Sequence, residues 1–429
     1  MRYETFDVVP LSRRAEWSEG QPISELMSLA IANPDLISLA AGFVDEQTLP
    51  VAAASRAVEE IFNDPQLARA ALQYGTTPGF VPLREAILAR HLSADNVAPS
   101  ESGLTVDQVV CTAGSNQLLH LISECILDPG DIMLCGSPTY FVYLGTLANL
   151  GARAIGVTTD AEGMDPDSLE ATLQQIDAKG ELHRVKGIYV ASFSDNPCGI
   201  TLPIDRRRRI VDIAKRWSQS ARLVVIEDVA YRELLYSGDD IPSMRSLDAD
   251  GDTVVLAGTF SKPFSPGIRV GWGLLPEYLV EPVGNQKGNI DFGSPNFNQL
   301  LMAKVLELNL FDPHVQTLCA QYRKKMGAML DAMDTHLSAL PGVSWVKPTG
   351  GLYVWLRLPA EIDAGPGGKL LNEAMREGMF YVPGEYCYPL EGEPACKNTL
   401  RLSFGVQSTE RIRIGIESLA RAIRKFVVQ

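Results

Sequence analysis

The sequence predicts an α/β protein, with a large domain built on a mostly parallel sheet covered by helices and a smaller α+β domain after it. Three observations lead to this prediction. Between residues 108 and 260, short apolar runs alternate with helical segments. The pattern changes between residues 290 and 315, and the later segments mix strands with long helices. The chain has 429 residues, of which 46% are hydrophobic, so it is long enough for two packed domains.

The first unit begins with helices and continues with strands and helices in turn. Residues 51–62 and 79–92 carry apolar side chains at helical spacing. Strand-like runs follow at 108–112, 131–136, 152–159, 185–193, 222–228 and 253–260, with helical patterns at 116–127, 141–151 and 205–217. Because the strand-like runs are short, continuous and apolar, both faces of the sheet are expected to be covered by helices.

The second unit begins with a long helix over about residues 296–335, which we expect to be broken near Pro313. Residues 343–358 predict two strands joined by a Pro-Thr-Gly-Gly turn, and helical patterns cover 369–378 and the end of the chain from 408. The expected division is 1–50 for an N-terminal arm and part of the small domain, 51–305 for the large domain, and 306–429 for the small domain.

Composition argues against several classes of partner. The formal net charge is −14, from 38 basic and 52 acidic residues, which disfavours nucleic acids and anionic membranes. Seven scattered cysteines predict reduced thiols in a cytoplasmic protein, and the first residues lack the apolar core of a secretory signal. The five histidines stand far apart, so we expect no metal site. The four arginines 206–209 predict a solvated helix face.

Polar residues gather where the strands of the first unit end, which is where ligands bind in open α/β sheets. Ser115 and Asn116 follow the strand at 108–112 and open a helix, whose free N–H groups suit a phosphate, although Ser115 alone predicts an ordinary helix cap. Asn196 precedes Pro197 after the strand at 185–193, a pair that is also ordinary turn chemistry.

Two further strand ends carry charged residues. Asp228 closes a strongly apolar run, with Tyr231 three residues on, and such a carboxylate needs a cationic partner unless it caps the next helix. Ser261 and Lys262 follow the run at 253–260, and Pro263 disfavours a helix at the lysine. Arg269 comes seven residues later, where an ion pair with an acidic neighbour is the alternative interpretation.

Together these strand ends predict one pocket. A helix N-terminus, an amide, an acid, a lysine and an arginine fit a phosphorylated aromatic ring that carries a basic nitrogen and an aldehyde. Pyridoxal 5′-phosphate is such a molecule. The lysine supplies a Schiff base, and the acid keeps the ring nitrogen protonated so that the ring accepts electrons.

Ordered motifs along the chain carry a family resemblance. They include "LISLAAGFVDEQTLP", "LQYGTTPGFVPLREAI", "GSNQLLHLI", "DNPCG", "EDVAYRELLY", "TFSKPFSPGIRVGW", "PTGGLYVWL" and "NTLRLSFG". From about residue 20 to 425 the sequence resembles the class I/II (fold-type I) pyridoxal-phosphate-dependent aminotransferases, most closely the kynurenine/2-aminoadipate aminotransferase branch. The resemblance implies a seven-stranded, mostly parallel large-domain sheet and a homodimer with shared active sites.

The resemblance also implies a role for each matching position. Lys262 would form the Schiff base and move the proton, and Asp228 would pair with the ring nitrogen. Asn196 and Tyr231 would bond the phenolic oxygen of the ring, and Tyr140 would stack on its face. Arg401 would clamp the substrate α-carboxylate beside Gly42. The phosphate would be held by Ser115, Asn116, Ser261, Arg269 and, from the neighbouring subunit, Tyr74.

The implied activity is transfer of an amino group from an L-amino acid to a 2-oxo acid in two half-reactions. The branch suggests 2-aminoadipate, aromatic or leucine-like donors, with 2-oxoglutarate as acceptor. A lyase or decarboxylase on the same scaffold remains an alternative. A regulator domain is disfavoured, since such proteins carry a basic DNA-binding domain before this fold. Asn116, Cys198, Ala230 and Pro263 depart from the usual family residues without removing a reacting group.

Overall fold

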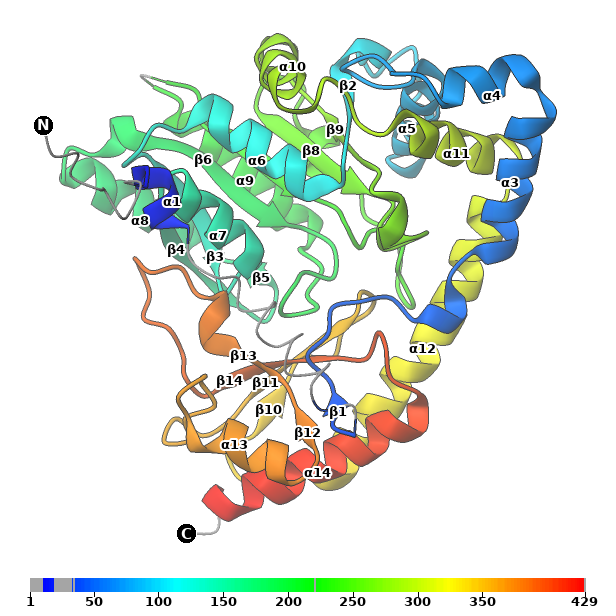
Figure 1. Ribbon diagram of the computed structural model, residues 1–429. Helices are drawn as coiled ribbons and strands as arrows, with labels where there is room; N and C mark the ends of the chain where they lie inside the picture. Colours follow the sequence, from blue (N-terminus) through cyan, green and yellow to red (C-terminus); the bar gives the residue numbers. More distant parts are fainter. Residues whose placement is uncertain (1–10, 19–32, 34, 220, 428–429) are drawn as a thin grey trace, which may run out of the picture.

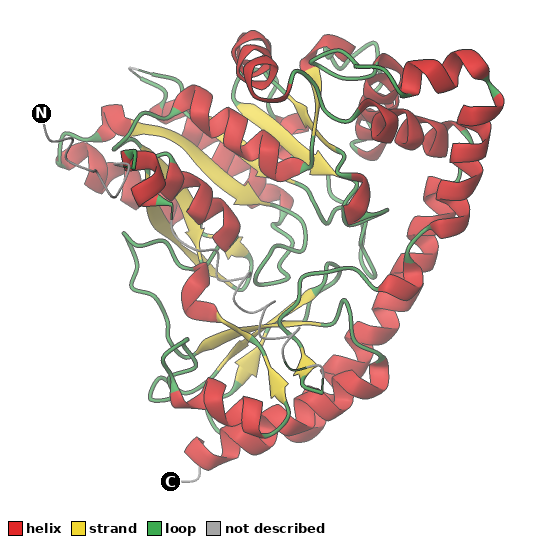
Figure 2. Ribbon diagram, in the orientation of Figure 1, coloured by secondary structure: helices red, strands yellow, loops and turns green. Residues whose placement is uncertain are grey.

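The computed structural model describes residues 11–18, 33, 35–219 and 221–427, and Figure 1 shows their arrangement. Much of the expected N-terminal arm, residues 1–10 and 19–32, lies outside the described residues. The described part of the arm includes α1 (Arg13–Trp17) and β1 (Ile37–Ser38). Two layered bodies, each built on its own sheet, are visible in Figure 2.

The main sheet has the strand order β2-β9-β8-β7-β6-β3-β4-β5. Its strands are β2 (Val109–Thr112), β3 (Ile132–Ser137), β4 (Arg153–Asp160), β5 (Gly163–Met164), β6 (Val185–Ala191), β7 (Val224–Asp228), β8 (Val254–Thr259) and β9 (Gly271–Leu274). Strands β4, β3, β6, β7 and β8 run parallel, while β9 and β5 are antiparallel to their neighbours. The mostly parallel sheet is confirmed, and the two-residue β5 adds an eighth strand to the seven expected.

Helices cover both faces of this sheet, as the apolar strands predict. One face packs against α6 (Ser115–Ile126), α7 (Phe141–Asn149) and α10 (Glu277–Asp291). The other face packs against α8 (Pro166–Ala178) and α9 (Ile204–Trp217). A further core beside β2 and β9 contains α3 (Val51–Asn63), α5 (Val81–Ala94) and α11 (Asn296–Glu307), with α4 (Pro65–Ala71) alongside α3.

A separate smaller domain holds the second sheet, ordered β10-β11-β14-β13, and the parallel pair β1-β12. Its strands are β10 (Ser344–Trp345), β11 (Tyr353–Arg357), β12 (Met379–Phe380), β13 (Val382–Pro383) and β14 (Thr399–Ser403). Its helices are α12 (Phe311–His336), α13 (Lys369–Arg376) and α14 (Thr409–Val427). The long helix breaks between α11 and α12, just before Pro313, close to the predicted position. Along the described chain, no helix is both long and apolar enough to cross a bilayer.

The solvated face predicted for arginines 206–209 is wrong for one of the four. Arg207 is 0% exposed, whereas Arg208 and Arg209 are exposed. The Arg207 guanidinium donates hydrogen bonds to three backbone carbonyls and lies 3.7 Å from the buried carboxylate of Glu227. A run of like charges says nothing about which member of the run faces inward on the helix, so the composition argument missed it.

Candidate active site

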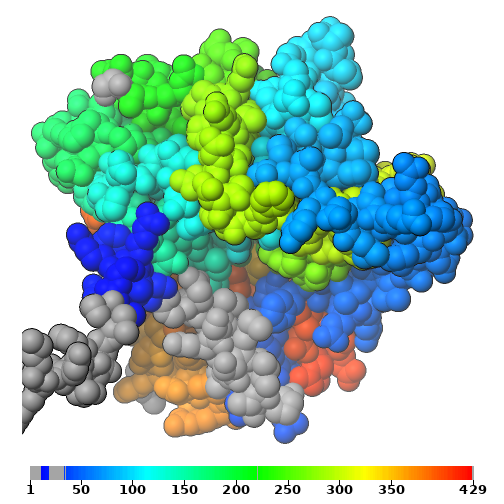
Figure 3. Space-filling model, turned by 45° about the horizontal axis from the view of Figure 1, so that its top comes forward, coloured from blue at the N-terminus to red at the C-terminus, as the bar shows by residue number. Residues whose placement is uncertain are grey.

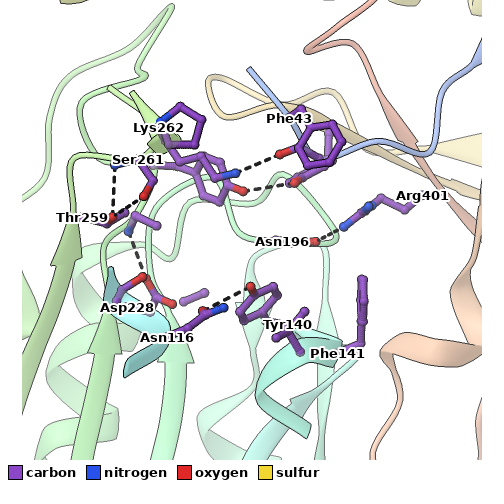
Figure 4. Close-up of a pocket in the computed structure, with 18 of the residues that line it drawn as sticks. Phe43, Asn116, Tyr140, Phe141, Asn196, Asp228, Thr259, Ser261, Lys262 and Arg401 are labelled. Atoms are coloured by element: carbon purple, nitrogen blue, oxygen red, sulfur yellow. Dashed lines mark hydrogen bonds between the residues drawn. The ribbon is translucent and has the colours of Figure 1, made fainter. Parts of the chain in front are cut away.

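A cavity of about 370 Å³ lies at the carboxyl ends of the parallel strands, between the large domain and the small-domain strand β14 (Figure 4). The ends of β6, β7 and β8 and the N-terminus of α6 meet there because these strands run in one direction. The predicted residues that line it are Gly42, Ser115, Asn116, Tyr140, Asn196, Asp228, Tyr231, Ser261, Lys262, Arg269 and Arg401.

Lys262 lies in the loop that follows β8 and points across the cavity to the N-terminal strip, the segment around Ala40 and Gly42 (Figure 4). Its Nζ donates a hydrogen bond to the carbonyl oxygen of Gly42 at 2.8 Å. Burial lowers the pKa of the Lys262 ammonium; Tyr353 and Asp228 oppose this shift, and the nearby cations Arg401 and Arg269 add to it. A lysine held in this way is poised to act as a neutral amine, the form that attacks a carbonyl.

Asp228 is the last residue of β7 and is 7% exposed. Its carboxylate accepts hydrogen bonds from the hydroxyl of Tyr189 at 3.0 Å and from the N–H of Ala230 at 3.1 Å. Burial raises the pKa of Asp228, while these hydrogen bonds and the charge of Lys262 oppose the shift. Its bonding partners are neutral, so a cationic ring nitrogen would supply the missing counter-charge.

The first turn of α6 and the loop after Lys262 form a cradle for an anion. Arg269 adopts a left-handed conformation with φ 50°, and its Nη2 donates to the carbonyl of Ala113 at 3.0 Å. Gly114 caps α6 at φ 89°, and a Cβ at this position would lie 2.4 Å from Arg269 Nη2. Ser261 Oγ lies 3.5 Å from Arg269 Nη1. Free N–H groups, a hydroxyl and a guanidinium suit a phosphate, so these residues fit the phosphate of the expected cofactor.

Arg401 enters the site from β14 of the small domain and is 1% exposed. Its Nη1 donates to Asn196 Oδ1 at 2.8 Å, and its Nη2 donates to the carbonyl of Ala40 at 2.9 Å. The guanidinium lies 4.3 Å from the ring centre of Tyr353. Its Nε is buried and has no hydrogen-bond partner in the described chain. A carboxylate ligand in the cavity would satisfy an arginine held in this orientation.

Aromatic and amide side chains line the wall between these charged groups. The hydroxyl of Tyr140 donates to Asn116 Oδ1 at 3.3 Å. The hydroxyl of Tyr231 donates to Tyr353 Oη at 3.1 Å, and burial raises the pKa of Tyr231. Gly42 has no room for a side chain, since a Cβ there would lie 2.6 Å from Tyr353 Oη.

Tyr74 is the one predicted site residue that the chain does not bring to the cavity. Its side chain is 80% exposed and makes an edge-on contact with Phe292, with ring centres 5.6 Å apart. The segments around these residues lie next to each other on one face of the molecule (Figure 3), and the Thr77 hydroxyl donates to the Phe292 carbonyl.

The sequence interpretation missed several residues that line the cavity. Tyr189 bonds Asp228 from the neighbouring strand, and Tyr353 lies against both Arg401 and Tyr231. Thr259 ends β8 and donates to Ser261 Oγ at 3.0 Å. Tyr189 and Thr259 lie in strands whose ends are followed by predicted residues, and that position was the available signal; Tyr353 lies in β11, beside the strand that carries Arg401. Phe43 and Phe141 also line the cavity and carried no polar signal.

This fold and pocket define an α/β enzyme-like site with one half-buried lysine and one buried acid. The profile of the family described as Aminotransferase class I and II matches residues 34–419. The chain therefore belongs to the aminotransferase class I and II family, and the resemblance drawn from the motifs is confirmed.

Individual relatives match nearly the whole chain. An aromatic-amino-acid aminotransferase from Thermococcus litoralis is 33% identical over 414 residues, which are 96% of this chain and 94% of that protein. A 2-aminoadipate transaminase from Thermus thermophilus is 30% identical over 408 residues, 95% of this chain and 94% of that protein. A kynurenine aminotransferase structure from Pyrococcus horikoshii, in complex with PMP, superimposes with a TM-score of 0.87 at 31% identity and covers 97% of both chains. The fold is that of the fold-type I aminotransferases.

Proposed function

We propose that this protein is a pyridoxal-phosphate-dependent aminotransferase that moves the amino group of an L-amino acid to a 2-oxo acid. The single observation that carries the proposal is the convergence of Lys262, Asp228 and the anion cradle on one cavity of about 370 Å³. The bound cofactor would supply an aldehyde that accepts the amino group and a ring that withdraws electrons. Family membership supports the class of reaction.

Lys262 and Asp228 are the two residues to which we assign chemical roles. Lys262 attaches the cofactor through Nζ and, once released by substrate, holds and moves the proton that leaves the substrate Cα. A positioned acid–base group of this kind contributes about 10²–10⁴-fold to the rate. Asp228 holds positive charge at the ring nitrogen, and its burial among neutral partners supports that task.

The other cavity residues bind and orient. Arg401 binds the substrate α-carboxylate beside Gly42, and its position in the lining of the cavity supports this role. Asn196 and Tyr231 hold the phenolic oxygen, and Tyr140 packs on the ring. The residues proposed to hold the phosphate are Ser115, Asn116, Ser261 and Arg269.

We also propose a homodimer in which Tyr74 reaches the phosphate of the neighbouring subunit. Exposed apolar side chains support a contact face at Tyr74: Phe292, which contacts Tyr74, is 63% exposed, and Leu72, two residues before Tyr74, is 71% exposed. The proposed division of the chain is 1–50, 51–305 and 306–429, and the proposed location is the cytoplasm.

The proposed donors are 2-aminoadipate, aromatic and leucine-like amino acids, with 2-oxoglutarate as acceptor. Named relatives that act on aromatic amino acids and 2-aminoadipate support this range. A half-reaction screen tests it: protein loaded with pyridoxal phosphate is mixed with each amino acid while the cofactor absorbance is followed. Conversion to the amino form of the cofactor identifies a donor. Release of ammonia or carbon dioxide instead would assign the protein to the lyase or decarboxylase class.

The attachment itself is tested separately. Borohydride reduction of the loaded protein followed by peptide mapping is expected to label Lys262, and Lys262→Ala is expected to abolish the labelling. Protein that stays colourless with excess pyridoxal phosphate, or a label on another lysine, would contradict the proposal.

A further inference from the structure

An ion pair between a buried lysine and a half-buried aspartate lies outside the residues assigned to the site. Lys287 on α10 is 0% exposed, and its Nζ donates to both carboxylate oxygens of Asp291, at 2.8 and 2.7 Å. Burial lowers the pKa of Lys287, and the carboxylate of Asp291 opposes that shift. Charged groups are costly to bury, and an apolar pair of similar volume would often stabilise a helix contact at least as well. Stability alone therefore does not account for a charged pair here.

Gln117 on α6 connects this pair to the next layer of the structure. Its Nε2 donates to Asp291 Oδ2 at 2.7 Å, and its Oε1 accepts the N–H of Ala113 at 2.7 Å. The two bonds need opposite ends of the amide, so Asp291 fixes which way the Gln117 amide points. With Lys287 bound to both oxygens of Asp291, the whole chain of hydrogen bonds has one orientation.

Ala113 is where the chain of hydrogen bonds reaches the anion cradle. Its N–H is held by Gln117, and its carbonyl oxygen accepts a hydrogen bond from Arg269 Nη2 at 3.0 Å. Thr112 Oγ1 donates to the carbonyl of Gly114 at 3.0 Å. Both backbone polar groups of Ala113 are therefore hydrogen-bonded, the N–H to Gln117 and the C=O to Arg269. Ala113 lies directly before the first turn of α6.

We infer that Gln117, Asp291 and Lys287 are positioning residues that set the phosphate cradle through the peptide of Ala113, an inference that rests on the proposed function. Gln117 bonds the backbone beside the cradle, Asp291 and Lys287 act through Gln117, and none of the three lines the ring end of the cavity. Loss of the network is therefore expected to weaken binding of the phosphate of the cofactor and to leave recognition of the ring unchanged. If the network only joined α10 to α6, its loss would affect phosphorylated and unphosphorylated ligands alike.

The test compares pyridoxal phosphate with pyridoxal, which has the same ring and aldehyde but no phosphate. Dissociation constants of both are measured by absorbance on the full chain and on Gln117→Leu, which removes both amide bonds. Gln108→Leu is the matched control, because Gln108 makes the same kind of bridge at the other end of β2, accepting from Thr105 N–H and donating to the Leu275 carbonyl.

Gln117→Leu is expected to raise the dissociation constant of pyridoxal phosphate about tenfold, the effect of one well-placed hydrogen bond. The dissociation constant of pyridoxal is expected to change by less than about twofold. The double variant Lys287→Met/Asp291→Leu removes the anchor but keeps an apolar contact, and it is expected to shift the same ratio in the same direction. Equal weakening of both ligands, or no change in either, would overturn the inference. A parent protein that takes up neither ligand would overturn the proposed function as well.

Discussion

Replacing Arg207 by leucine would remove the buried guanidinium that donates hydrogen bonds to the backbone on both sides of the loop that carries Asn196. The guanidinium donates to the carbonyls of Leu202, Ser192 and Pro242 at 2.8, 2.7 and 2.9 Å. It also lies 4.0 Å from the ring centre of Phe193. Because the carbonyls of Ser192 and Leu202 lie on either side of Asn196 in the sequence, Arg207 fixes both ends of the segment that carries Asn196.

The expected loss of stability follows from what stays behind in the interior. Glu227 is 0% exposed and lies 3.7 Å from Arg207, so the leucine variant leaves a buried carboxylate without its cation. Removing one partner of a buried pair costs about 3–5 kcal/mol, and each unbonded buried carbonyl adds about 1–3 kcal/mol. Burial raises the pKa of Glu227, so proton uptake offsets part of the charge penalty, while three buried carbonyls still lose their donor, and we expect a loss of at least about 3 kcal/mol in total.

Urea unfolding followed by circular dichroism measures this loss. Arg208→Leu is the matched control, because Arg208 is the next residue of the same helix and is exposed. It is expected to change the free energy of unfolding by less than about 0.5 kcal/mol. Arg207→Met/Glu227→Met removes both charges and should recover part of the loss. Equal urea midpoints for Arg207→Leu and Arg208→Leu would refute the reasoning.

Three further changes test the site and its surroundings. Arg401→Lys is expected to raise the KM for the amino donor about 10²-fold, because one ammonium cannot replace the planar fork, and steady-state kinetics with intact cofactor absorbance check it. Burial raises the pKa of Asp195 to about 7 from 3.8, so its stabilising contribution is full below pH 3.8 and is lost as the pH rises through 7. Asp195→Asn should therefore gain stability relative to the parent over that range, by at most roughly 4 kcal/mol in pH-dependent unfolding. Mixing Lys262→Ala with Tyr74→Ala subunits should restore about a quarter of the parent sites, since each mixed dimer holds one complete site, and activity no higher than that of either variant alone would argue against sharing.

The parts of the site that the sequence could predict are those that local pattern and chain direction determine. A polar residue directly after an apolar run lies at a strand end, and parallel strands bring their carboxyl ends to one edge. This reasoning predicts that Asn196, Asp228 and Lys262 lie together, and all three line the cavity. The family motifs supplied the position of Arg401.

The rest depends on contacts between segments far apart in the chain. The bond from Lys262 to the carbonyl of Gly42 joins residues 220 positions apart, and neither neighbourhood signals the other. Tyr189 and Tyr353 look like ordinary strand aromatics until the fold places their hydroxyls beside Asp228 and Tyr231. Helical periodicity places Arg207 on the same face as the buried Ile210 and Ala214, but the local pattern does not show its partner Glu227 on β7.

The way the cavity holds its cations explains how an acidic protein attracts anionic ligands there. Lys262 and Arg401 donate to backbone carbonyls of the N-terminal strip, and Arg269 donates to the carbonyls of Ala113 and Pro266. Elsewhere arginines pair with carboxylates, as Arg153 does with Glu391. A neutral acceptor orients a cation without cancelling its charge, so the guanidinium groups of Arg401 and Arg269 keep their positive charge at the cavity while the chain as a whole carries −14. That local excess of positive charge favours a phosphate at one end and a carboxylate at the other, and it lowers the pKa of the lysine between them.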